Sequence, residues 1–186
     1  MVCEQIIKKF RDFDPQEHFV IAPEGLSRLY LNGFGGDVVA TWMTSRDRLH
    51  EIADFSDYLS TLYEKYEAEL PADCNKIVMG FSQGGTTIFR WLHRNKINVD
   101  HVLGYSCWVP EDIDLGASKT GLATKNLIWT YGLQDQFLTT ERIDTVKRVM
   151  EKNKLNFKME GYEGDHRVSS EQLKSIFIKY FSSNLV

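Results

Sequence analysis

The chain has 186 residues and a formal net charge of −4. Its length predicts one domain over residues 1–186, and a hydrophobic fraction of 42% is enough to bury a core. The acidic balance offers no basic stripe for a phosphate backbone, so a nucleic-acid partner is not expected. No apolar run approaches the ~20 residues of a membrane span, and three widely spaced cysteines indicate reduced thiols in the cytoplasm.

Short apolar runs alternate with amphipathic segments along the chain. The first helix is expected at Cys3–Arg11 and the first strand at His18–Ala22. Pro23–Arg48 is rich in turn-forming residues and is expected to form a long loop. The later helices are predicted at Asp47–Tyr66, Gly84–Asn95, Glu141–Asn153 and Ser169–Phe181, and the later strands at Lys76–Gly80, His101–Tyr105, Leu127–Tyr131 and Phe157–Gly161.

This alternation predicts an α/β fold with a mostly parallel central sheet, because parallel strands are joined through right-handed helical crossovers. Ligands of such sheets bind beyond the carboxyl ends of the strands. The residues that directly follow the predicted strands are therefore the candidates for a functional site.

A serine stands between the strand Lys76–Gly80 and the helix Gly84–Asn95. The segment Gly80–Gly84 (GFSQG) matches G-x-S-x-G, in which a sharp strand-to-helix turn exposes the serine. This context favours Ser82 as a nucleophile. The alternatives are a turn used only for packing and a loop that cradles a phosphate, although no Walker lysine follows.

A serine nucleophile needs a base. Of the five histidines, His166 follows the last predicted strand, at the catalytic end of the sheet. The other four, His18, His50, His93 and His101, lie within helices or precede strands. A solvated loop histidine remains the alternative for His166.

The base in turn needs an orienting acid, and Asp135 follows the strand Leu127–Tyr131. The chain order of Ser82, Asp135 and His166 is the order used by α/β-hydrolases. Weaker candidates for the acid are Asp165, Asp112 and Asp114, and Asp135 as an ordinary turn residue remains open.

The remaining site predictions concern the oxyanion and the substrate. The backbone N–H of Gln83, at the start of the helix, is the expected oxyanion donor. Trp42, Met43 and Trp108 are expected to form an apolar rim for an acyl chain or a hydrophobic alcohol, with a role as core aromatics as the alternative. No histidine pair has metal-ligand spacing and the cysteines are isolated, so neither a metal nor a cofactor is expected.

The sequence resembles the phospholipase/carboxylesterase group of α/β-hydrolases, which includes acyl-protein thioesterases and bacterial serine esterases. The resemblance implies a three-layer α/β-hydrolase-type sandwich and a metal-independent esterase with Ser82, Asp135 and His166 as its triad. It is carried by Ala22–Gly25 (APEG), Thr41–Met43 (TWM), Gly80–Gly85 (GFSQGG), the Asp135 loop and Gly164–His166 (GDH).

The chain departs from this family at its start, because no strand and no His-Gly loop precede Cys3–Arg11. That loop supplies a second oxyanion N–H in the family, and losing one donor costs about 10²–10³ in kcat. We therefore expect an N-terminally abbreviated fold, in a truncated product or with a sheet that closes across the gap. An exposed sheet edge would favour a homodimer.

Two functions follow from this sequence. The first is a cytoplasmic serine hydrolase that cleaves carboxylic esters or thioesters through an acyl-enzyme on Ser82. The alternative is a degenerate hydrolase that binds a small molecule or a lipid with little or no catalysis.

Overall fold

The computed structural model of the protein describes residues 2–181. The chain divides into two compact units, one made of Met1–Glu51 with Val168–Val186 and the other of Ile52–Arg167. Each unit has a sheet of its own. The single domain over residues 1–186 stays a prediction.

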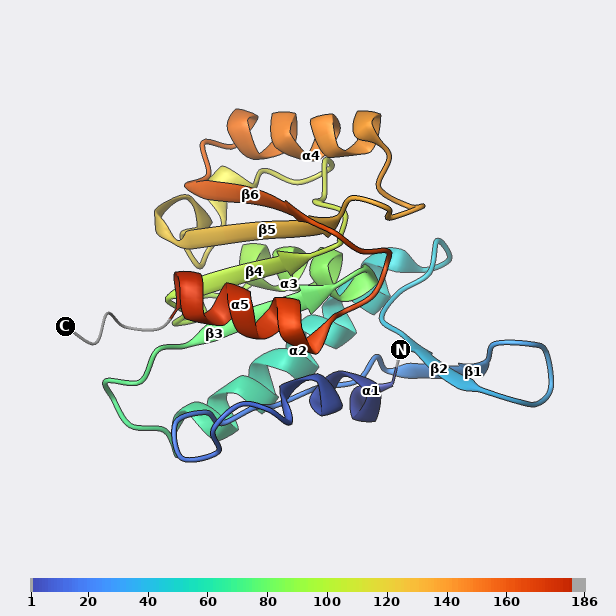
Figure 1. The fold of residues 1–186 in the computed structure, drawn as a ribbon, viewed down its shortest axis with the longest axis horizontal. Coiled ribbons are helices and arrows are strands. Elements are labelled where there is room, and N and C mark those ends of the chain that lie inside the picture. Colours follow the sequence, from blue (N-terminus) through green and yellow to red (C-terminus); the bar gives the residue numbers. More distant parts are fainter. Residues whose placement is uncertain (1, 182–186) are drawn as a thin grey trace. The chain divides into compact units, whose positions relative to one another are not determined.

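The sheet of the unit Ile52–Arg167 has four parallel strands, side by side in chain order (Figure 1). Each strand lies within two residues of its predicted position, because short apolar runs bounded by turn residues are typical of buried parallel strands. The strands are β3 (Ile77–Phe81), β4 (His101–Tyr105), β5 (Asn126–Gly132) and β6 (Phe157–Tyr162). Their parallel register places all four carboxyl ends at one edge of the sheet.

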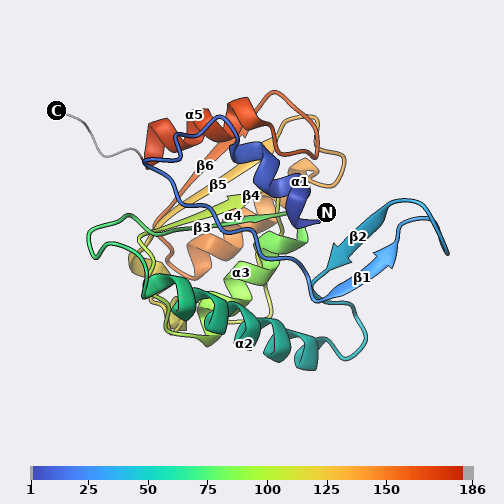
Figure 2. The same ribbon diagram turned by 90° about the horizontal axis from the view of Figure 1, so that it is seen from below.

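The strand order determines on which face of the sheet the helices of this unit lie. Because β3 to β6 succeed one another in one direction, right-handed crossovers put α3 (Gln83–Arg94) and α4 (Thr140–Lys152) on the same face (Figure 2). The long helix α2 (Arg48–Glu67) meets α3 where the indole Nε1 of Trp91 donates to Ser60 Oγ at 2.9 Å.

The core between α3 and the sheet is tightly packed around Gly104 in β4. A Cβ there would come within 2.8 Å of the Trp129 ring and 3.5 Å of Phe89, and both side chains are fully buried. The indole of Trp129 also donates to the carbonyl of Cys107 at 3.1 Å, so its polar atom is satisfied. This packing fixes the segment that follows β4.

The other unit contains an antiparallel hairpin of β1 (Ser27–Tyr30) and β2 (Val38–Thr41). The prediction of a long loop over Pro23–Arg48 is therefore wrong. All four residues of β1 are exposed, so the strand lacks the alternation of apolar and polar residues that marks a half-buried strand.

The same unit holds two of the predicted helices. The first begins as α1 (Cys3–Ile7) and continues as a 3₁₀ turn over Lys8–Phe10. The last is α5 (Ser170–Tyr180), capped by the Ser169 hydroxyl, which accepts from the backbone N–H of Gln172.

The predicted strand His18–Ala22 does not form. The segment has no strand assignment, since a strand needs a pairing partner and this apolar run has none in either sheet. The sheet also does not close across the gap, because β3 pairs only with β4 among residues 2–181. A homodimer stays a prediction.

Among residues 2–181, no helix combines the length and the apolar character that a membrane crossing needs.

Candidate active site

The turn between β3 and α3 presents Ser82 at the end of the sheet. Ser82 has φ +54° and ψ −124°, a conformation that costs a non-glycine residue energy and that recurs at functional sites. Gly80 permits this turn, because a Cβ there would lie 2.4 Å from the carbonyl oxygen of Gly84. Ser82 is also held to β4, since its backbone N–H donates to the carbonyl of Tyr105 at 3.0 Å.

The structure brings Ser82, His166 and Asp135 together, although they come from three different loops. His166 Nε2 lies 2.9 Å from Ser82 Oγ, and His166 Nδ1 lies 2.7 Å from Asp135 Oδ2. An ionised carboxylate only accepts, so Nδ1 carries the proton and Nε2 is left to accept from the serine hydroxyl. The side chain of Asp135 is 0% exposed and that of His166 is 15% exposed, so water has little access to this bond.

The second carboxylate oxygen of Asp135 is occupied as well. Oδ1 accepts from the backbone N–H of Phe137 at 2.8 Å. The bond fixes the rotation of the carboxylate and keeps Oδ2 turned toward His166. The weaker candidates for the acid have other partners: Asp165 pairs with Arg167, Asp112 with Arg90, and Asp114 accepts from Ala117 N–H.

Two aromatic rings that the sequence analysis did not single out lie against the imidazole of His166. The ring of Phe81 is 4.9 Å away at a 37° tilt, and that of Phe137 is 4.8 Å away, edge to face. Neither has a periodic signal, and their only sequence cue is proximity to Ser82 and Asp135. Together they restrict the tilt of the imidazole.

The other predicted site residues fall in both units. Gln83 is the first residue of α3, where backbone N–H groups point toward the space before the helix. Trp108 is half-buried after β4, and its carbonyl accepts from the Thr86 hydroxyl of α3 at 2.9 Å. Trp42 and Met43 follow β2 in the other unit, so a rim shared with Trp108 stays a prediction.

Two ionisable groups near the site are neutral at physiological pH. Burial raises the pKa of the Cys107 thiol to about 12. Burial likewise raises the pKa of Tyr162, whose hydroxyl donates to the carbonyl of Arg167 at 3.0 Å, next to His166. Cys107 therefore supplies no thiolate that would compete with Ser82 as a nucleophile.

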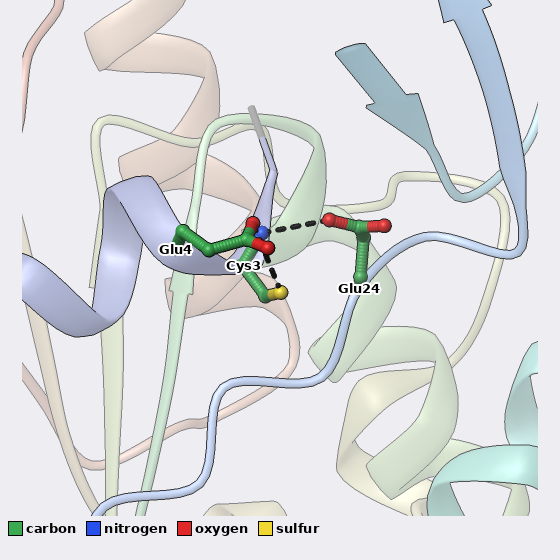
Figure 3. Close-up of side chains that lie close together, drawn as sticks. All are labelled: Cys3, Glu4 and Glu24. Atoms are coloured by element: carbon green, nitrogen blue, oxygen red, sulfur yellow. Dashed lines mark hydrogen bonds between the residues drawn. The ribbon is translucent and has the colours of Figure 1, made fainter. Parts of the chain in front are cut away.

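One cluster of metal-ligand residue types lies in the other unit, at Cys3, Glu4 and Glu24 (Figure 3). Cys3 Sγ donates to Glu4 Oε2 at 3.3 Å, and Cys3 N–H donates to Glu24 Oε2 at 2.8 Å. Burial and the hydrogen bond to Glu4 raise the pKa of the thiol, whereas a metal ligand must be a thiolate. Arg28 pairs with the other oxygen of Glu24 at 2.5 Å. The donors thus fit an anchor for the start of α1 better than a metal site.

The fold resembles those of several solved structures. SOBER1 from Arabidopsis thaliana superposes with a TM-score of 0.70 at 16% identity, over 93% of this chain and 87% of its own. Acyl-protein thioesterase 2 from Zea mays gives a TM-score of 0.61 at 19% identity, over 82% and 76% of the two chains. A Bacillus cereus carboxylesterase gives 0.57 at 16% identity, over 85% and 74%. These structures confirm the predicted three-layer α/β-hydrolase fold.

At the level of sequence, no curated protein matches the chain. The profile of the family described as Phospholipase/Carboxylesterase, in contrast, matches residues 15–182. That match includes the Ser82 turn and the loops of Asp135 and His166. The chain therefore belongs to the phospholipase/carboxylesterase family.

Proposed function

We propose that the protein is a serine hydrolase that cleaves carboxylic esters or thioesters through an acyl-enzyme on Ser82. The observation that carries the proposal is the continuous chain of hydrogen bonds from Ser82 Oγ through His166 to the buried carboxylate of Asp135. The family match and the thioesterase and carboxylesterase names of the structural neighbours support this class of substrate.

The first half of the reaction forms the acyl-enzyme. His166 Nε2 takes the proton of the Ser82 hydroxyl while Oγ bonds to the carbonyl carbon of the substrate. The negative charge on the carbonyl oxygen is stabilised by the Gln83 N–H at the start of α3. Collapse of the tetrahedral intermediate then breaks the bond to the alcohol or thiol, which leaves with the proton from His166.

The second half returns the enzyme to its starting state. Water gives a proton to His166 Nε2 and attacks the acyl carbon, and the acid product departs as Ser82 Oγ recovers its proton. Asp135 stabilises the imidazolium that forms in each half and keeps Nδ1 protonated. Within the unit Ile52–Arg167, we assign Trp108 as the apolar side chain that contacts the substrate.

Covalent labelling tests the proposal directly. A fluorophosphonate probe should label the wild type at Ser82, and Ser82→Ala should lose both the label and the hydrolysis of p-nitrophenyl butyrate. Ser27→Ala, at an exposed serine of β1, is the control and should behave as the wild type. Hydrolysis of butyrylthiocholine, followed by the release of its thiol, shows whether the enzyme prefers thioesters or oxygen esters. A wild type that binds an ester analogue but is neither labelled nor active would instead favour the alternative, a degenerate hydrolase that binds a small molecule or a lipid.

A further inference from the structure

A single glutamine joins the two loops that carry the proposed acid and base. Gln134 directly precedes Asp135, and its side-chain oxygen accepts from the backbone N–H of Gly164 at 2.6 Å. Its side-chain nitrogen donates to Glu163 Oε2 at 2.7 Å, and its backbone N–H donates to the Gly164 carbonyl at 2.9 Å. All three bonds end two or three residues before His166.

The backbones of the two loops approach closely beside this glutamine. A Cβ on Gly132 would lie 2.3 Å from the Gly164 carbonyl oxygen and 2.6 Å from that of Asp165. On the sheet side, the ladder continues past β5 through a bond from Leu133 N–H to the Tyr162 carbonyl at 2.8 Å. The loop of His166 is thus held to the loop of Asp135 by the sheet on one side and by Gln134 on the other.

Both ends of the amide are needed for this arrangement. The oxygen must face a donor, the N–H of Gly164, while the nitrogen must face an acceptor, the carboxylate of Glu163. A carboxylate at position 134 would still accept from Gly164 but would stand against the negative charge of Glu163. An apolar side chain of equal length would keep neither bond.

We propose that Gln134 is a positioning residue for the triad. It sets the distance between Asp135 and His166, whose 2.7 Å bond lies one residue from Gln134 on one loop and two residues from Gly164 on the other. Catalytic groups must be held within about 0.5 Å of their productive geometry by hydrogen bonds from the residues that support them, and the two side-chain bonds of Gln134 add such support to the backbone bonds between these loops. The inference rests on the proposed function, because it assigns Gln134 a role in that same site.

The test compares Gln134→Met, which keeps the length of the side chain and removes its polar atoms, with the wild type. We expect kcat for p-nitrophenyl butyrate to fall about tenfold to a hundredfold, since a small misplacement of catalytic groups has effects of that size. KM and the melting temperature should stay close to the wild-type values. An unchanged kcat in a folded, labelled protein would overturn the positioning role.

Two further measurements separate positioning from a general structural effect. Gln134→Glu should lose activity as Gln134→Met does, and the double variant with Glu163→Gln should recover it, because the carboxylate and the amide have then exchanged places. In an Asp135→Asn background, Gln134→Met should cost little more, since the bond through which it acts is already impaired. Failed rescue together with additive losses would refute the proposal.

The failure of the proposed function has a different signature. If the fluorophosphonate probe does not label wild-type Ser82, both the esterase proposal and the role of Gln134 fall. If the wild type is labelled and Gln134→Met is labelled at the same rate, only the role of Gln134 falls.

Discussion

The two ends of the parallel sheet use the same pair of residue types in different ways. At the carboxyl ends, His166 and Asp135 come from separate loops and meet side chain to side chain at 2.7 Å. At the amino ends, His101 and Asp100 are neighbours in sequence, and the Asp100 carboxylate accepts from the backbone N–H of Lys76 at 2.9 Å. The aspartate joins β3 to β4 at one end, and it orients an imidazole at the other.

The environments of the two histidines differ accordingly. Burial lowers the pKa of His101, so this imidazole is neutral in the folded protein at neutral pH. His166 instead has a carboxylate on Nδ1 and a hydroxyl on Nε2. A histidine next to an aspartate in sequence therefore indicates little about function, whereas hydrogen-bond partners from distant loops on both ring nitrogens indicate acid–base chemistry.

Replacing each histidine in turn gives the largest contrast. His166→Ala should lower kcat for p-nitrophenyl butyrate by a factor of about 10⁶, because the serine loses its base. His101→Ala should leave kcat near the wild-type value. Steady-state kinetics on both variants, with circular dichroism to show that both fold, checks this. Equal losses in the two variants would remove the distinction between the ends of the sheet.

The glycine at the carboxyl end of β5 gives the next largest effect. Gly132→Ala places a methyl group against the carbonyls of Gly164 and Asp165, so the loop of His166 has to move. We expect a drop in kcat of about 10² and a loss of about 1–3 kcal/mol in the free energy of unfolding. Gly35→Ala is the control, because a Cβ there has no neighbour within 4 Å. Normal kinetics for Gly132→Ala would show that the close approach has no bearing on the site.

The strands and helices around the carboxyl ends of the sheet were predicted well from sequence because their signals are local. An apolar run followed by G-x-S-x-G and a helix is readable residue by residue, and parallel pairing then brings Asp135 and His166 to the same edge. Gln134 and Phe137 were missed because their roles depend on partners more than 25 residues away, at Gly164 and His166. An exposed glutamine in a loop has no pattern that distinguishes it from a solvated one.

The unit with the hairpin was predicted less well for a related reason. His18–Ala22 has the composition of a strand, but pairing depends on a partner that composition does not reveal. In the hairpin, Tyr30 pairs with Val38 across a glycine-rich turn. All four residues of β1 are exposed, so its sequence has no apolar pattern that would predict a strand. The presence or absence of a pairing partner, rather than residue preference, decided both segments.

An ion pair behind the site gives a smaller effect, on stability rather than chemistry. The Arg90 guanidinium of α3 is 7% exposed and donates to Asp112 Oδ1 at 2.7 Å. Asp112→Ala removes this partner of a buried charge, and we expect a loss of about 1.5–3 kcal/mol in the free energy of unfolding. Urea denaturation measures this loss. Asp112→Asn should lose less stability than Asp112→Ala, because its side-chain oxygen can still accept from Arg90. Because Asp112 lies outside the triad, a drop in kcat comparable to that of Gly132→Ala would contradict this assignment.

The smallest expected effect is on stability, at Glu67 near the amino ends of the strands, and it depends on pH. Burial by itself would raise the pKa of Glu67, but hydrogen bonds from Lys76, Tyr63 and Asn98 outweigh it, so the pKa lies below its ordinary value of 4.5. A carboxylate with a lowered pKa in the folded state stabilises the protein above its unfolded pKa, and this contribution is lost as the pH falls through the folded pKa.

Glu67→Gln should therefore lower the free energy of unfolding at pH 7 by less than about 1 kcal/mol, because the pair with Lys76 is partly exposed. Below pH 4.5 the difference between variant and wild type should shrink toward zero, while kcat at pH 7 stays unchanged. Urea denaturation from pH 3 to pH 7 measures this. A difference that grows as the pH falls would mean that burial, and not the hydrogen bonds, dominates the pKa of Glu67. The charged carboxylate of Glu67 would then destabilise the folded protein instead of stabilising it.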